Sequence, residues 1–288
     1  MALRINYNFE SVSAQRNLSQ TQGSFFRAIE QLSSGLRINR ASDDAAGMAV
    51  SEKLKNQVRG LNQAQRNAQD AVSMLQVAEG ALNETHSLLA RMRELALQSA
   101  NDTLTAADRT HIQAEVNQLL SEVDRIAAST QFNKAVLLNG SATNTVFHVG
   151  ANAEPGTPNG SNELTFSIGS ASTAALSIST LGAGATGQLS SMSFQTSANA
   201  ALATLDTAIE SISTSRGRIG AMQNRLASTI NSLGVASENT GAANSRIRDA
   251  DVAQAVSEMV RTQILQQSTM AVLAQANQTP QMALQLLK

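Results

Sequence analysis

A seven-residue repeat of apolar side chains between Asp43 and Ala100 limits what this chain can fold into. One row of leucine and alanine recurs at every seventh position: Leu54, Leu61, Ala68, Leu75, Leu82, Leu89 and Ala96. A second row lies three residues further on: Ala64, Ala71, Ala78, Thr85 and Met92. The repeat predicts a helix of roughly 60 Å whose apolar seam packs along partner helices.

Three glycines, Gly47, Gly60 and Gly80, fall inside this predicted helix. Each costs about 1 kcal/mol relative to alanine in a helix interior, so they predict either a broken helix or very close backbone contacts. The acidic residues of 42–44 suit a helix N-terminus, where they cap free amides and meet the positive end of the dipole. An acid/base pair is the alternative, but no nucleophile, histidine or phosphate loop accompanies them.

Two shorter helices flank the long one. Residues 5–36 form a predicted helix with Leu18, Phe25 and Leu32 at seven-residue steps. The long helix is expected to end near Asn101, and Thr105 with Asp108 predicts a capping box for the next helix. The second seam is the set Ile112, Val116, Leu119, Val123 and Ile126.

The composition changes to Gly, Ser, Thr, Ala and Asn between Ser141 and Thr196, after an Asn139-Gly140 turn signal. Two of the three prolines, Pro155 and Pro158, fall here. Apolar side chains alternate with others at 146–149, 164–168 and 176–178, which predicts short strands in a loop-rich insert. A flexible linker is the alternative.

The heptad pattern then returns from Leu202 to Leu233, with Arg216 and Gln223 as its polar members. Polar residues in such a seam tend to fix register. Gly234 is a predicted helix stop, and residues 251–276 form a predicted final helix with Val252, Val256, Met259, Val260 and Ile264 as one apolar stripe. Because the two halves mirror each other, the terminal helices are expected to lie side by side.

Composition argues against several functional classes. A net charge of −1 gives no general attraction to nucleic acid, and there is no cysteine for disulfide or thiolate chemistry. No window resembles a membrane span, and residues 1–10 lack a signal-peptide pattern. His86, His111 and His148 have no metal-ligand spacing, and no cofactor or catalytic motif occurs, so we expect no cofactor and no enzyme.

Long motifs at both ends resemble those of bacterial flagellins. The N-terminal matches are MALRIN at 1–6, AQRNL at 14–18, LSSGLRIN at 32–39 and DDAAGMA at 43–49. The C-terminal matches are SRIRDAD at 245–251, QIL at 263–265, LAQAN at 273–277 and PQ at 280–281. The resemblance covers both ends and leaves out only the central insert.

The resemblance implies a mainly α fold of long antiparallel rods and terminal coiled-coil helices, with a small β insert. Residues 1–42 with 241–288 would form the inner core of a filament, 43–140 with 197–240 the rod domain, and 141–196 a variable surface insert. It implies a homopolymer for motility, exported unfolded through the flagellar channel, and found extracellularly. The implied partners are an export chaperone, cap and hook-junction proteins.

The same resemblance carries particular residues. The polymerisation helices would use Leu18, Phe25, Leu32, Val256, Val260, Ile264 and Leu273. The innate-immune Toll-like receptor for flagellin would contact Arg91, Leu95 and Glu115. Arg91 and Leu95 are four residues apart, so they share a helix face, and both lie off the main seam. They are therefore expected to be free for an outside partner.

Other functional classes remain open from the sequence. A hook–filament junction protein would share the end helices. A chemoreceptor-like signalling rod would share the Ala-rich hairpin. Such a role would need a membrane span, which the sequence does not show, and it would not account for the apolar C-terminal tail. An enzyme within the insert would have to rely on one histidine and two acidic residues.

Overall fold

The computed structural model describes residues 7–152, 162–181 and 195–286, with side chains from 198 to 278 in the last range. The described helices are α1 (Phe9–Ser34), α2 (Ala45–Ser99), α3 (Ala106–Ser129), α4 (Gln195–Arg248) and α5 (Val252–Leu286). Two small antiparallel sheets join them. The mainly α prediction is therefore confirmed. The chain divides into two compact units, residues 1–57 with 238–288 and residues 58–237.

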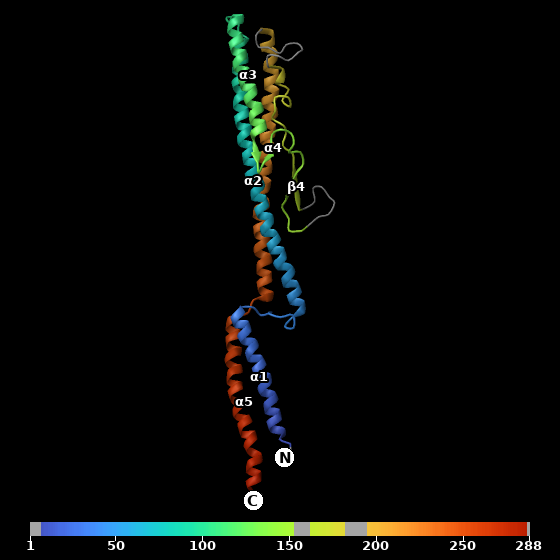
Figure 1. Cartoon of the computed structure of the whole chain (residues 1–288), viewed down its shortest axis with the longest axis vertical. Helices are drawn as coiled ribbons and strands as arrows, with labels where there is room; N and C mark the ends of the chain where they lie inside the picture. The colour runs from blue at the N-terminus through green and yellow to red at the C-terminus, as the bar shows by residue number, and fades with distance from the viewer. Residues whose placement is uncertain (1–6, 153–161, 182–194, 287–288) are drawn as a thin grey trace. The chain divides into compact units, whose positions relative to one another are not determined.

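In the first unit α1 and α5 lie side by side and antiparallel (Figure 1), as the mirrored halves predict. Asn8 caps α1 by accepting a hydrogen bond from the Ser11 N–H at 3.0 Å, and its amide donates to the Ala276 carbonyl at 2.8 Å. At the other end the Ala250 N–H donates to the Gly35 carbonyl at 2.9 Å. Gly35 is left-handed, with φ +70°, and ends α1. The predicted end at residue 36 is therefore two residues too long.

The start of α2 also lies in the first unit. Of the predicted capping residues, Asp44 takes the role, because its Oδ1 accepts a hydrogen bond from the Gly47 N–H at 2.8 Å. Asp43 instead accepts from the Arg40 N–H in the preceding turn at 3.0 Å. A Cβ on Gly47 would lie 2.9 Å from Ile38 Cδ1 and closer still to the Asp44 carboxylate. This glycine therefore marks a close contact with side chains, and not the close backbone contact that was predicted.

In the second unit α2 and α4 run antiparallel. Ser237 Oγ hydrogen-bonds to Asn62 Oδ1 at 2.8 Å, and Arg93 pairs with Asp206 at 2.6 Å. Every member of the two predicted rows of α2 from Leu61 to Ala96 is buried. The long-helix prediction is confirmed, and its glycines do not break it. A Cβ on Gly60 would lie 3.1 Å from Ala151, whereas nothing lies near one on Gly80.

Two helix predictions need correction. In α3 the most deeply buried side chains include Leu120 and Ala127, while Leu119 and Ile126 are only half-buried. A straight helix drifts by about 20° per heptad, so a strict heptad does not track the packed face. Gly234 does not end α4, which continues to Arg248. The Thr105–Asp108 capping box is confirmed.

The strands are partly as predicted. β3 (Thr145–His148) pairs with β4 (Glu163–Phe166). A hairpin of β1 (Gln131–Phe132) and β2 (Ala135–Val136) was not predicted; its two turn residues have positive φ, which is the primed turn that fits strand twist. The predicted strand at 176–178 is wrong.

That segment is a turn that leads into the 3-10 helix η1 (Ser179–Leu181). The Ile178 N–H donates to the Thr173 carbonyl at 3.0 Å, so its hydrogen bonds are local. The Thr173 N–H in turn donates to the Asp124 carboxylate of α3 at 2.9 Å, which anchors the turn on the rod.

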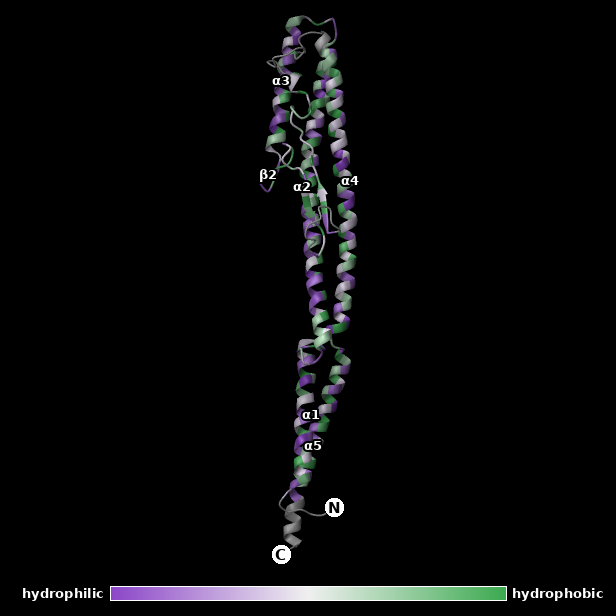
Figure 2. Ribbon diagram, turned by 90° about the vertical axis from the view of Figure 1, so that its right-hand side faces the viewer, coloured by the Kyte–Doolittle hydropathy of each residue, from purple (hydrophilic) through white to green (hydrophobic). Residues whose placement is uncertain are grey.

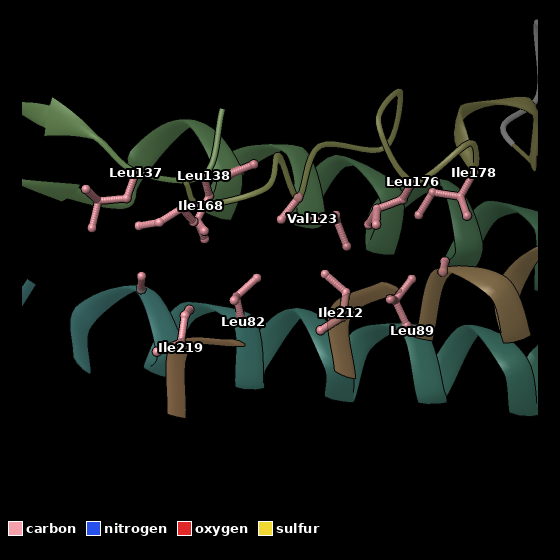
Figure 3. Close-up of a cluster of buried hydrophobic side chains, with 14 of the residues drawn as sticks. Leu82, Leu89, Val123, Leu137, Leu138, Ile168, Leu176, Ile178, Ile212 and Ile219 are labelled. Atoms are coloured by element: carbon pink, nitrogen blue, oxygen red, sulfur yellow. The ribbon is translucent and has the colours of Figure 1, made fainter. Parts of the chain in front are cut away.

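The insert was predicted to lie at the surface, but it also contributes side chains to the core of the second unit. Figure 3 shows Leu176 and Ile178 facing Leu89 and Ile212 of the long helices. The insert side chains in this cluster are Phe147, Val149, Leu164, Ile168, Ala171, Leu176, Ile178 and Leu181. The described part of the insert therefore covers apolar surface that helices α2, α3 and α4 would otherwise leave exposed.

Candidate assembly interface

Small side chains line the face along which α1 and α5 meet. Ala14 and Ala28 of α1 are buried there, as are Ala255, Thr262 and Ala276 of α5. Thr262 satisfies its hydroxyl on its own helix, donating to the Glu258 carbonyl at 2.8 Å. Small side chains allow the two backbones to approach closely, but they bury little apolar area. The pair therefore gains little stability from its own contact.

Many of the large apolar side chains of this pair point away from that face. Phe26 of α1 is 66% exposed and Ile264 of α5 is 60% exposed. Figure 2 shows hydrophobic residues along both helices. The exposed set is Phe9, Val12, Phe26 and Ile29 on α1, and Val252, Val256, Val260, Ile264, Leu265, Met270 and Val272 on α5.

On α5 these side chains lie on more than one face outside the face that it turns to α1. Each residue advances a helix by about 100°. By that step, counted from Thr262, Val256, Val260 and Ile264 fall at about 120°, 160° and 200°, largely opposite the face that meets α1. Leu265 and Val272 fall at about −60° and −80°, on one flank of that face. A helix that is apolar all round is normally buried. The apolar side chains of α5 therefore need more packing partners than α1 provides.

Some of the predicted polymerisation residues are exposed and the others are half-buried. Val256, Val260 and Ile264 are exposed, whereas Leu18, Phe25, Leu32 and Leu273 are half-buried. The apolar stripe predicted for α5 is therefore not one face, since Met259 is half-buried while the other predicted members of the stripe are exposed. Sequence reasoning missed Phe9, Phe26, Leu265 and Val272; the available signal was apolar side chains on a second face of an amphipathic helix.

The predicted receptor residues lie in the second unit. Arg91 has a side chain 51% exposed, and its guanidinium pairs with Glu115 at 2.9 Å and with Glu94 at 3.2 Å. These partners, Glu115 first, raise the pKa of Arg91 above its usual value. Leu95 is only 2% exposed, so the expectation that it lies free for a partner is wrong. It belongs to the buried cluster that also holds Ile112, because the buried face of α2 is wider here than one heptad seam.

Within the part of the chain that the structure describes, no group of histidine and acidic side chains could hold a metal ion. No described helix combines the length and apolar character needed to cross a bilayer.

These features define a class of protein: a helical structural subunit whose terminal helices leave many apolar side chains uncovered. Residues 5–143 match the bacterial flagellin N-terminal helical region, and residues 202–287 match the bacterial flagellin C-terminal helical region. The chain belongs to the bacterial flagellin family. It is a subunit of the flagellar filament, and in this family such subunits self-assemble outside the cell for motility.

Two relatives span the whole chain. A flagellin of Halalkalibacterium halodurans is 45% identical over 284 residues, covering 99% of each chain. The flagellar filament 33 kDa core protein of Treponema phagedenis is 46% identical over 294 residues, again covering 99% of each. The solved structure of a putative flagellar hook-associated protein from Vibrio parahaemolyticus has a TM-score of 0.55 and 18% identity, covering 72% of this chain and 100% of that one, and shows a shared fold.

Proposed function

We propose that the subunits polymerise through α1 and α5, with residues 1–42 and 241–288 forming the inner core of the filament. Residues 43–140 with 197–240 form the surrounding rod layer, and 141–196 faces outward. The observation that carries this proposal is the set of exposed apolar side chains on two faces of α5 that α1 does not cover. Two different faces make a head-to-tail contact possible, and a head-to-tail contact that does not close into a ring grows into a helical filament.

The energetics favour burial between copies. Fully burying one Val or Ile side chain stabilises by about 1.5–3 kcal/mol. Since α1 and α5 meet through small residues, most of the stability of these helices has to come from packing against other chains. Several such side chains per subunit are enough to drive association once the entropy of assembly is met.

Removing residues 251–288 tests the proposal. Seeded growth of the truncated protein should give no filaments, while helical circular dichroism shows the second unit still folded. Within the full chain, Val260→Asp with Ile264→Asp should block growth, because the charges would be buried. Gln118→Asp with Ser121→Asp adds the same charge at exposed polar positions of α3, outside the terminal helices, and serves as the matched control. Normal filaments from the truncated protein would contradict the proposal.

The export route belongs to the same proposal. The subunit travels unfolded through the secretion channel of the flagellum, a chaperone covers α5 before export, and cap and hook-junction proteins guide assembly. Two features support this. The chain has no cysteine, so no disulfide has to be broken for it to unfold. The exposed apolar side chains of α5 also need cover in a monomer.

A second role is recognition of the monomer by the innate-immune Toll-like receptor for flagellin. Support comes from Arg91 and Glu115, which form an exposed ion pair between α2 and α3. Arginine is enriched among residues that dominate binding energy at interfaces. Because Leu95 is buried, it supports this surface from beneath and does not touch the receptor.

A further inference from the structure

A groove on the second unit carries two arginines without acidic partners. The groove lies between β4 and α4 and has a volume of about 420 Å³. Phe166 and Met222 supply apolar wall, and Arg218 and Arg225 border it. The two arginines are seven residues apart on α4, so they share a face and lie about 10.5 Å apart along the helix axis.

Three other exposed arginines of this unit have their charge offset within the chain. Arg91, Arg93 and Arg125 each pair with a carboxylate. Neither Arg218 nor Arg225 has a carboxylate within ion-pair distance among the residues that the structure describes. This groove therefore presents unpaired positive charge beside apolar surface.

A second surface of the same unit has the opposite character. On α2, Asp70, Val77 and Glu84 follow one another at seven-residue steps. Asp70 and Glu84 are exposed and form no ion pair within the described ranges, and Val77 is 41% exposed. The stripe thus places an apolar side chain between two free carboxylates.

We propose that the α2 stripe of one subunit docks on the α4 groove of a neighbouring copy. This inference rests on the proposed polymerisation and names a contact between rods, apart from the terminal helices. Val77 then lies over Phe166 and Met222, with one carboxylate beyond each arginine.

The two sets of charges differ in spacing, with about 21 Å between the carboxylates along α2 and about 10.5 Å between the arginines along α4, so each arginine has to extend outward along the axis. Each carboxylate lies about 10.5 Å from Val77 along its helix, while the arginines lie about 6 Å and 4.5 Å from Met222 along theirs. The difference of about 5 Å at each end is bridged by the long, flexible arginine side chains. The two surfaces are on different helices and are not self-complementary. The contact is therefore heterologous, and it extends a filament instead of closing a dimer.

Charge exchange tests the contact directly. The measurement is the critical monomer concentration for seeded filament growth, obtained by sedimentation. R218E with R225E should raise it about tenfold or more, and so should D70R with E84R, because like charges would meet. The protein with all four changes should return to within about threefold of wild type, since the charges are again opposite.

The matched control is R59E with K134E, which changes the net charge by the same amount at exposed positions outside both surfaces. It should leave the critical concentration near the wild-type value. Circular dichroism of each monomer checks that the fold is kept.

Three results would overturn the contact. The first is unchanged growth of the two double variants, which is also expected if the groove binds another protein. The others are a fourfold variant that assembles as poorly as the double variants, or an equal loss of growth in the control. Wild-type protein that forms no filaments would overturn the proposed polymerisation as well, which separates the two failures.

Discussion

Gln223 of α4 donates a hydrogen bond from its Nε2 to Oε2 of Glu79 on α2 at 2.9 Å. Both side chains are half-buried between the two antiparallel helices. Arg216, the other polar member of the heptad seam, is also half-buried, and its Nε has no hydrogen-bond partner. Two polar groups therefore interrupt an otherwise apolar contact, and only one has found a partner. That they set the register of the rods stays a prediction.

Removing one partner of this pair should be worse than removing both. Gln223→Leu leaves the Glu79 carboxylate half-buried without its donor, so the free energy of unfolding should fall by about 1–2 kcal/mol. Glu79→Leu with Gln223→Leu should recover that loss, and Arg216→Leu should raise the melting temperature.

Urea unfolding of wild type, Gln223→Leu, Glu79→Leu and the double variant measures the coupling, and thermal unfolding of Arg216→Leu measures the change in its melting temperature. Strictly additive effects of Glu79→Leu and Gln223→Leu would mean that the pair is not coupled. If the pair also fixes register, the double variant should form filaments of altered shape under electron microscopy.

Two glycines of α2 should respond to alanine in opposite ways. At Gly47 the added Cβ would collide with Ile38 and with the Asp44 carboxylate that caps the helix. Gly47→Ala should therefore destabilise by about 1–3 kcal/mol, the usual range for overpacking. At Gly80 nothing lies within 4 Å of the added atom. Gly80→Ala should stabilise by up to about 1 kcal/mol through helix propensity, and thermal unfolding distinguishes the two signs.

The capping box of α3 should make stability depend on pH. The Thr105 hydroxyl and backbone N–H donate to the Asp108 carboxylate at 2.7 Å and 3.0 Å, and these hydrogen bonds lower the pKa of Asp108. A lowered folded-state pKa stabilises at pH values above the unfolded value of about 3.9, and this contribution is lost as the pH falls through the folded value.

Asp108→Asn should therefore be less stable than wild type near pH 7, with the difference shrinking towards pH 3. Thr105→Ala should show the same convergence, since it removes the donor hydroxyl. A difference that stays constant over this pH range would show that the carboxylate charge has no part in the cap.

Receptor recognition can be tested at an exposed residue. Arg91→Ala should lower the potency of the monomer in a receptor-reporter assay by about tenfold, in line with loss of an interface arginine. Arg125→Ala is the control, because Arg125 forms a similar exposed pair with Glu122 on α3. Leu95→Ala is unsuitable, since emptying a buried leucine site would destabilise the fold by about 2–5 kcal/mol. Equal potency of Arg91→Ala and wild type would remove the receptor site from this face.

Periodicity was sufficient for the long helix α2. The rows from Leu61 to Ala96 are buried as predicted, because a seven-residue repeat sustained over many turns has one stable use, a seam between helices. The Thr105–Asp108 cap was also readable, since caps are satisfied by side chains within a few residues.

Only the tertiary structure decided which flanks of these helices are covered. Leu95 lies off the heptad seam but is buried, because α2 packs against more than one element at that point. Leu176 and Ile178 alternate like a strand but reach the core from a turn that Asp124 anchors. The apolar residues of α5 lie outside its contact with α1. Local pattern fixes helix or strand through backbone geometry, whereas burial depends on which distant segment arrives at each face, and that information is spread over the whole chain.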